Sequence, residues 1–235
     1  MLQRFSTGLP ELDGFMEGGF PHDATILLVG FPGSGKTTFS SQFLYNAVTK
    51  NNLKGVYVSY AETKESFMQN MLRFGWNFEQ LEKEGKVSIL DLSVTKEIGL
   101  QKHIDLIIET MRNLDAQILI IDPVSAMNMG FKEQIEVRVM MHLLYRFLKK
   151  ANCMAILIMD QPWGTSTIGE GISEFIVDGI IHLETYFDKK ETLRRRMRIL
   201  KMRGTSHIKT PIPYDINQKG FVIITKKSRN PKKDA

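Results

Sequence analysis

The sequence contains the stretch Gly30-Phe31-Pro32-Gly33-Ser34-Gly35-Lys36-Thr37, which matches the complete phosphate-loop pattern G-x-x-x-x-G-K-[ST]. An apolar, strand-like segment, Thr25 to Val29, precedes it, and Phe39, Phe43 and Leu44 follow it at helical spacing. A glycine-rich turn between a strand and a helix lets backbone N–H groups and the helix N-terminus face an anion. Because strand, loop and helix agree, the stretch predicts a site for a nucleoside triphosphate.

The loop also predicts a Mg²⁺ site. Lys36 can reach the β- and γ-phosphates, and the Thr37 hydroxyl can ligate Mg²⁺. Downstream, the apolar run Ile118–Ile121 ends in Asp122, which is the Walker B pattern, and we expect Asp122 beside the loop as a second group for the ion. The loop residues expected to bind the nucleotide are Gly30, Pro32, Gly33, Ser34, Gly35, Lys36, Thr37 and Thr38.

Hydrolysis needs a group that orients or deprotonates the attacking water. Glu62 follows the apolar segment Gly55–Tyr60, and ligands of open α/β sheets bind beyond the carboxyl ends of strands. We therefore predict that Glu62 activates the water. The alternative is that Glu62 only favours the N-terminus of the next helix. Asp160 and Gln161 end another apolar segment, either as sensors of the γ-phosphate or as ordinary polar residues at a strand end.

Strand-like and helical patterns alternate along the first two thirds of the chain. Continuously apolar runs such as Ile118–Ile121 are typical of strands buried on both faces. The alternation predicts an α/β fold with a central, mostly parallel sheet flanked by helices. Strands are expected at Thr25–Gly30, Gly55–Tyr60, Val87–Asp91, Gln117–Asp122 and Met154–Asp160, and helices at Glu65–Phe74, Leu100–Leu114 and Gln134–Lys150.

The last third of the chain predicts an antiparallel extension of this sheet. Two extended segments, Asp178–Thr185 and Leu193–Met202, flank a charged turn, and Ile212–Ile216 and Gly220–Ile224 form a hairpin. We expect one domain spanning residues 1–225 and a flexible basic tail over residues 226–235.

The composition is that of a soluble globular protein, because 43% of the 235 residues are hydrophobic and 24% are charged. The sequence has neither an apolar run of the ~20 residues that would cross a bilayer nor the apolar core of a signal peptide. The single cysteine, Cys153, lies in an apolar stretch and is most simply a buried thiol. We expect a cytoplasmic protein without membrane insertion.

The net charge of +5 is concentrated in two basic clusters, Lys189–Arg203 and the tail. Such clusters attract nucleic acid or an acidic partner, or they form a solvated strand face and a disordered tail. Within the first cluster, Lys201 and Arg203 are two residues apart on an expected strand, so both point the same way. Two cations directed at one spot suit a phosphate, although composition alone also fits a solvated edge.

Several motifs, taken in order, resemble the KaiC-like branch of the RecA superfamily of ATPases. They are Ser6–Asp13 with Gly18–Pro21, the phosphate loop, Val58–Thr63, the strand ending in Asp122, and the distinctive segment Lys201–His207. The similarity runs from about Arg4 to Ile224. It implies a RecA-like core, ATP as the nucleotide, and a ring, commonly a hexamer, with ATP bound between subunits.

The same resemblance implies roles for particular residues. Lys201 and Arg203 become fingers that reach the γ-phosphate of a neighbouring subunit, and His207 lies near that neighbour's nucleotide. It also supports Glu62 as the water-activating carboxylate. Similar sequences often have two consecutive glutamates where this chain has Ala61 and Glu62, which suggests slower or differently regulated hydrolysis.

Clock proteins of this type carry two tandem ATPase domains, whereas this chain has one, so a clock or autokinase role does not carry over. The chain is more similar to single-domain archaeal KaiC-like proteins or recombinase paralogues. The leading hypothesis is an oligomeric, Mg²⁺-dependent ATPase that acts as a nucleotide-driven switch on its own ring or on a protein partner.

Two other functions stay open at this point. One is a DNA-binding recombinase paralogue, although Gln161–Glu174 contains no Lys or Arg and no separate DNA-binding domain is visible in the sequence. The other is a nucleotide-gated scaffold with little turnover, which Ala61 alone supports.

Overall fold

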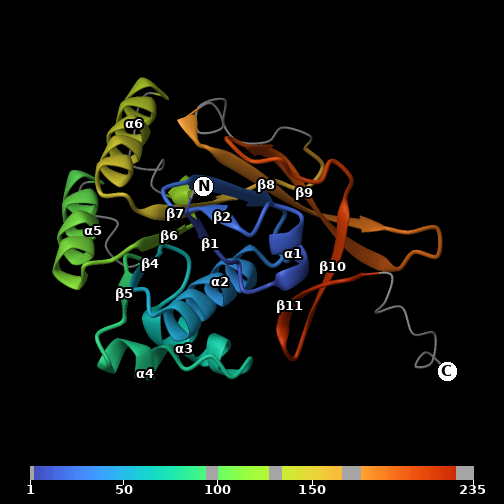
Figure 1. Ribbon diagram of the computed structural model, residues 1–235, viewed down its shortest axis with the longest axis horizontal. Helices are drawn as coiled ribbons and strands as arrows, with labels where there is room; N and C mark the ends of the chain where they lie inside the picture. Colours follow the sequence, from blue (N-terminus) through green and yellow to red (C-terminus); the bar gives the residue numbers. More distant parts are fainter. Residues whose placement is uncertain (1–2, 94–99, 127–133, 166–175, 226–235) are drawn as a thin grey trace.

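Figure 1 shows the computed structural model, which describes residues 3–93, 100–126, 134–165 and 176–225. The helices are α1 (Pro10–Gly14), α2 (Lys36–Asn51), α3 (Lys64–Leu72), α4 (Phe78–Lys83), α5 (Leu100–Leu114) and α6 (Gln134–Lys150). The strands are β1 (Arg4–Phe5), β2 (Phe20–Pro21), β3 (Thr25–Gly30), β4 (Gly55–Ser59), β5 (Val87–Asp91), β6 (Ile118–Asp122), β7 (Met154–Asp160), β8 (Gly179–Phe187), β9 (Leu193–Met202), β10 (Ile212–Asn217) and β11 (Gly220–Ile223).

Nine of these strands form one mixed sheet in the order β11-β10-β9-β8-β3-β7-β6-β4-β5. The six strands from β8 to β5 are parallel, and β9, β10 and β11 continue the sheet in antiparallel fashion. The strand β7 lies between β3, which leads into the phosphate loop, and β6, which ends in Asp122. Because parallel strands end at the same edge, the ends of all three strands meet beside the loop.

Helices cover both faces of the sheet, as the continuously apolar strands predict (Figure 1). One buried cluster joins alternate strand residues such as Ile26 and Leu28 to side chains of α1, α2, α3 and α4. A second cluster joins the intervening residues, such as Leu27 and Val29, to α5 and α6. The period of two along each strand therefore divides the core into two layers.

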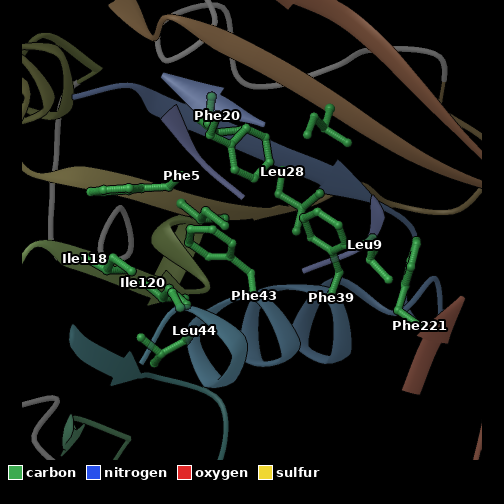
Figure 2. Packing of buried hydrophobic residues seen from close by; sticks show 14 of the residues in the cluster. Phe5, Leu9, Phe20, Leu28, Phe39, Phe43, Leu44, Ile118, Ile120 and Phe221 are labelled. Carbon is green, nitrogen blue, oxygen red and sulfur yellow. The ribbon is translucent and has the colours of Figure 1, made fainter. Parts of the chain in front are cut away.

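The helix that follows the phosphate loop is fixed by aromatic packing. Figure 2 shows Phe39 and Phe43 projecting from α2 toward the sheet, in the region of Phe20 and Leu28. The rings of Phe43 and Phe20 meet edge to face with centroids 5.5 Å apart, and Phe39 meets Phe221 at 5.1 Å. These contacts hold the N-terminus of α2, and with it the loop, against the sheet.

Phe43→Ala is expected to lower the free energy of unfolding by about 3–5 kcal/mol, because it removes a fully buried ring and leaves a cavity. Denaturant unfolding of the two proteins measures the difference. Leu72→Ala, at a residue that is 56% exposed, is the matched control, with an expected change within about 0.5 kcal/mol. A similar change for both variants would contradict the assigned core.

The predicted α/β class, central sheet and antiparallel extension are confirmed, and several predicted boundaries coincide with those observed. The others differ by one or two residues: β4 ends at Ser59, β6 begins at Ile118, and α3 spans Lys64–Leu72. The sequence did not predict α1, α4 or the two-residue strands β1 and β2. The basic tail lies outside the described residues.

The β8–β9 pair has a register irregularity at Ile180/Ile181, where Ile180 pairs with Lys201 and Ile181 with Ile199. Leu200 is therefore the extra residue of a bulge. Alternation is broken there, so Lys201 lies on the same face as Arg198 despite the odd spacing between them. Arg198, Arg196 and Arg194 share that face, and Met197 and Ile199 are buried on the other.

Cys153 is buried, as predicted, and burial raises the pKa of its thiol to about 12. Among the described helices, none is both long and apolar enough to cross a membrane.

Candidate functional site

The phosphate loop connects β3 to α2 and has little space around it. Gly35 has a φ of 91°, and a Cβ atom there would lie 2.3 Å from Cδ1 of Ile216. A Cβ on Gly30 would lie 2.6 Å from the carbonyl oxygen of Leu183. The hydroxyl of Tyr214 donates a hydrogen bond of 2.7 Å to the carbonyl oxygen of Ser34. The glycines of the motif are therefore needed for close packing against β8 and β10 as well as for the turn.

The start of α2 fits a phosphate group. Its N-cap residue is Gly35, and no side chain caps the helix. The N-terminal N–H groups of a helix without a side-chain cap, together with the positive end of the helix dipole, favour an anion. The hydroxyl of Ser34 is buried and has no hydrogen-bond partner within the described parts of the chain.

Lys36 is buried and is held at three points. Its ammonium group donates to the carbonyl oxygens of Gly30 at 2.8 Å and Phe31 at 3.1 Å, and it pairs with Asp160 at 3.0 Å. The backbone N–H of Gln161 donates to the same Gly30 carbonyl at 3.1 Å. The end of β7 is thus bonded directly to the loop, and Asp160 is the acidic partner of Lys36 in this state.

Thr37 and Asp122 are in direct contact beside the phosphate loop. The Thr37 hydroxyl donates to Oδ2 of Asp122 at 2.6 Å, and the Tyr57 hydroxyl donates to the same oxygen at 2.6 Å. Burial raises the pKa of Asp122, and the nearby charge of Asp160 raises it further, whereas the two hydroxyl donors lower it. A buried hydroxyl and carboxylate beside a phosphate loop fit Mg²⁺, which takes one or two protein ligands plus waters and phosphate oxygens.

Glu62 lies in the connection between β4 and α3, with its carboxylate directed along the first turns of that helix. Its Oε2 atom accepts hydrogen bonds from the Ser66 hydroxyl at 3.1 Å and from the Asn70 amide at 3.0 Å. A cavity of about 590 Å³ adjoins it. The cavity is lined by the start of α2, by α3 and by the β10–β11 turn: Thr37, Thr38, Glu62, Asn70, Met71, Arg73, Phe74, Ile216, Asn217 and Gln218.

A buried polar network leads from the loop into β8. Oε1 of Gln161 lies 2.8 Å from Nε2 of His182, and Nδ1 of His182 lies 3.4 Å from Oε1 of Glu184. Glu184 also binds the guanidinium groups of Arg196 and Arg198. Burial lowers the pKa of His182, and the two arginines lower it further against the opposing effect of Glu184.

Since the folded-state pKa of His182 is below its unfolded value, the unfolded chain binds a proton first as the pH falls. We expect this residue to reduce stability as the pH drops below about 6.5, with a slope of at most about 1.4 kcal/mol per pH unit. Denaturant unfolding of the protein and of His182→Gln at pH values between 7 and 5 measures the contribution of His182 to the pH dependence of the free energy of unfolding. Equal slopes for both proteins would contradict the assignment.

Lys201 and Arg203 do not lie near the phosphate loop of their own chain, and Nδ1 of His207 lies 3.0 Å from the Ile208 carbonyl oxygen. The ammonium group of Lys201 donates to the Val177 carbonyl at 2.6 Å, and the Arg203 guanidinium lies 3.7 Å from the Asp178 carboxylate. The backbone N–H of Asp178 donates to the carbonyl oxygen of Thr25, the first residue of β3. The phosphate loop begins at Gly30, the last residue of β3. Thr25 and Gly30 are five residue steps apart along the strand, which is roughly 16 Å.

Several residues around the loop carry no sequence motif and were missed. Tyr57 in β4 and Tyr214 in β10 are buried aromatic side chains whose hydroxyl groups bond to Asp122 and to the Ser34 carbonyl. Phe31 stacks on Trp163 with ring centroids 4.7 Å apart and planes 6° apart, which ties the loop to the segment after β7. Contacts between such distant segments can be predicted only when the order of the strands in the sheet is known.

Comparison with known proteins agrees with this arrangement. The family model "ATPase: KaiC" matches residues 5–228. A UPF0273 protein of Pyrococcus horikoshii is 32% identical over 95% of this chain and 94% of its own length. The circadian clock oscillator protein KaiC of Thermostichus vulcanus is 31% identical over 97% of this chain, which spans only 47% of that protein.

Among solved structures, a KaiC-like protein from Pyrococcus horikoshii superposes with a TM-score of 0.86 at 32% identity, covering 96% of this chain and all of that one. The two chains share the RecA-like fold. With a family model that spans nearly the whole sequence and a relative of matching length, the chain belongs to the KaiC family of ATPases.

Proposed function

We propose that the chain, as one domain over residues 1–225, binds Mg²⁺–ATP and hydrolyses it slowly at a site completed by a second copy. The observation that carries this proposal is the separation of Lys201 and Arg203 from their own phosphate loop. Two cations roughly 16 Å from the loop cannot act on the nucleotide bound there. A neighbouring copy in a ring, as the resemblance implies, gives them a target.

Within one chain, Lys36 leaves Asp160 and binds the β- and γ-phosphates, while the start of α2 holds the phosphate oxygens. Thr37 and Asp122 hold Mg²⁺, which when bound neutralises charge on the phosphates. The cavity of about 590 Å³ next to Thr37, Thr38 and Glu62 is large enough for the rest of the nucleotide.

Glu62 orients the water and accepts its proton, since its carboxylate borders this cavity and is fixed by Ser66 and Asn70. Gln161 senses the γ-phosphate, because its backbone N–H bonds to Gly30 of the loop and its side chain contacts His182. Lys201 and Arg203 of the adjacent copy stabilise the developing charge, and His207 follows them in the same segment.

The test is the molar mass by light scattering with and without Mg²⁺–ATP, with phosphate release followed on the same samples. We expect nucleotide-dependent assembly, with a hexamer as the expected size, accompanied by slow turnover. Assembly without turnover would replace this proposal with the nucleotide-gated scaffold. A monomer that binds ATP without assembling or hydrolysing it would contradict the shared site.

The DNA-binding alternative loses support from the packing of the arginine cluster. Arg194 pairs with Asp188 at 2.8 Å and Arg195 with Asp215 at 3.0 Å, while Arg196 and Arg198 hold Glu184. Side chains that are neutralised by acidic partners contribute less to phosphate binding. We therefore favour the ATPase over the recombinase paralogue.

A further inference from the structure

The turn that carries the two proposed fingers, residues 201–205, is bonded to Asp178, the residue that precedes β8. The backbone N–H of Arg203 donates to the Asp178 carbonyl at 2.9 Å. The next residue, Gly204, has a φ of 65°, and the N–H of Thr205 donates to the Met202 carbonyl at 3.3 Å. We call residues 201–205 the finger turn. The Arg203 side chain remains 53% exposed, as a group that acts on a neighbour must be.

The finger turn is also bonded to Arg4, which lies 201 residues before Thr205 in the sequence. One terminal nitrogen of its guanidinium, Nη1, donates to the Thr205 hydroxyl at 3.0 Å and to the Gly19 carbonyl at 3.1 Å. The other, Nη2, pairs with Glu17 at 2.8 Å and lies 3.5 Å from the Gly204 carbonyl. The Arg4 side chain is only 13% exposed, although it bears a full charge.

The backbone around Arg4 is shaped to receive this side chain. Arg4 opens β1, which pairs with β2 through Arg4 and Pro21, so its Cα position is fixed. Gly19 has a φ of 119°, and a Cβ there would lie 2.2 Å from the Phe5 carbonyl oxygen. The chain thus turns tightly beside the guanidinium, and the planar fork of arginine bonds the Glu17–Gly19 segment and the finger turn in one fixed geometry.

We propose that Arg4 is a positioning residue for Lys201 and Arg203, an inference that rests on the proposed shared site. A finger acts only if its cation sits where charge develops, and a misplacement of 1 Å can cost about 100-fold in rate. Asp178 binds the finger turn at Arg203, whereas Arg4 binds it at Gly204 and Thr205. Arg4 therefore restrains the part of the turn that the bond to Asp178 does not reach.

Arg4→Ala is expected to lower kcat for ATP hydrolysis by about 10- to 100-fold and to leave ATP binding by the variant unchanged. Arg4→Lys, which keeps the charge near Glu17, is expected to lie between Arg4→Ala and the wild type. Arg195→Ala, which removes another arginine paired with an aspartate, is the matched control and should retain full activity. Loss of ATP binding in both Arg4 variants would overturn the proposal.

The decisive experiment mixes two variants before Mg²⁺–ATP is added. In Arg4→Ala the nucleotide site is intact and the fingers are loose, whereas in Glu62→Gln the fingers are intact and the site is inactive. In an equal mixture about one quarter of the junctions pair an intact site with intact fingers, so turnover should rise to about a quarter of the wild-type rate.

The reference mixture of Arg203→Ala with Glu62→Gln tests the shared site independently of Arg4. Rescue in the reference but not with Arg4→Ala would show that Arg4 acts inside its own subunit, which overturns the positioning role and leaves the shared site standing. Rescue in neither mixture would remove the shared site and the role of Arg4 with it. Rescue in both establishes Arg4 as a residue that acts through the finger turn.

Discussion

Glu62→Gln is expected to lower kcat for ATP hydrolysis by about 100-fold or more while ATP binding persists. The amide keeps the size of the side chain and can still bond to Ser66 and Asn70, but it cannot take a proton from water. Phosphate release measures the first effect, and equilibrium titration with a fluorescent ATP analogue measures the second.

The matched control is Glu65→Gln, which removes an exposed carboxylate from the first turn of the same helix. It should leave both quantities unchanged. Normal turnover in Glu62→Gln would show that the carboxylate only favours the start of α3, which is the alternative that the sequence leaves open.

Arg203→Ala is expected to reduce kcat by about 1,000-fold, the lower end of what an arginine finger contributes, with ATP binding retained. The reason is geometric: Arg203 lies beside Asp178, near the start of β3, whereas the loop follows the end of β3, so its removal leaves the loop and the contact of Thr37 with Asp122 intact. Phosphate release and the same binding titration measure the two effects.

Arg194→Ala is the control for Arg203→Ala, because the two side chains are 57% and 53% exposed and each faces an aspartate. Arg194 lies at the other end of β9, near the β8–β9 turn, and its removal should leave turnover unchanged. Equal losses in both variants would point to a general effect of charge on solubility or assembly instead of a finger.

The sequence predicted the parallel core well because its strands are continuously apolar and its helices are long. The predicted bounds of β3, β5, β7 and α5 coincide with those observed. Each of the three strands ends in a glycine or an aspartate, and Gly99 and Asp115 border α5. The helix α4 has only six residues, and β1 and β2 only two each, so none of them is long enough to show a period.

Within the candidate site, the phosphate loop and the pair of Thr37 and Asp122 were predictable from motifs. The contacts of Lys36 with Asp160 and of Tyr57 with Asp122 were not, because they depend on β7 lying between β3 and β6. Local periodicity carries no information on strand order. The bond between Arg4 and Thr205 is the extreme case, because it joins residues 201 positions apart in the sequence.

The central claim is that each nucleotide site takes its fingers from another copy of the chain. The most direct test is the phosphate-release rate of an equal mixture of Glu62→Gln and Arg203→Ala, each nearly inactive alone. Our account predicts that the mixture recovers about a quarter of the wild-type rate, because about one junction in four joins an intact carboxylate to an intact finger. A mixture no more active than its two components would contradict it.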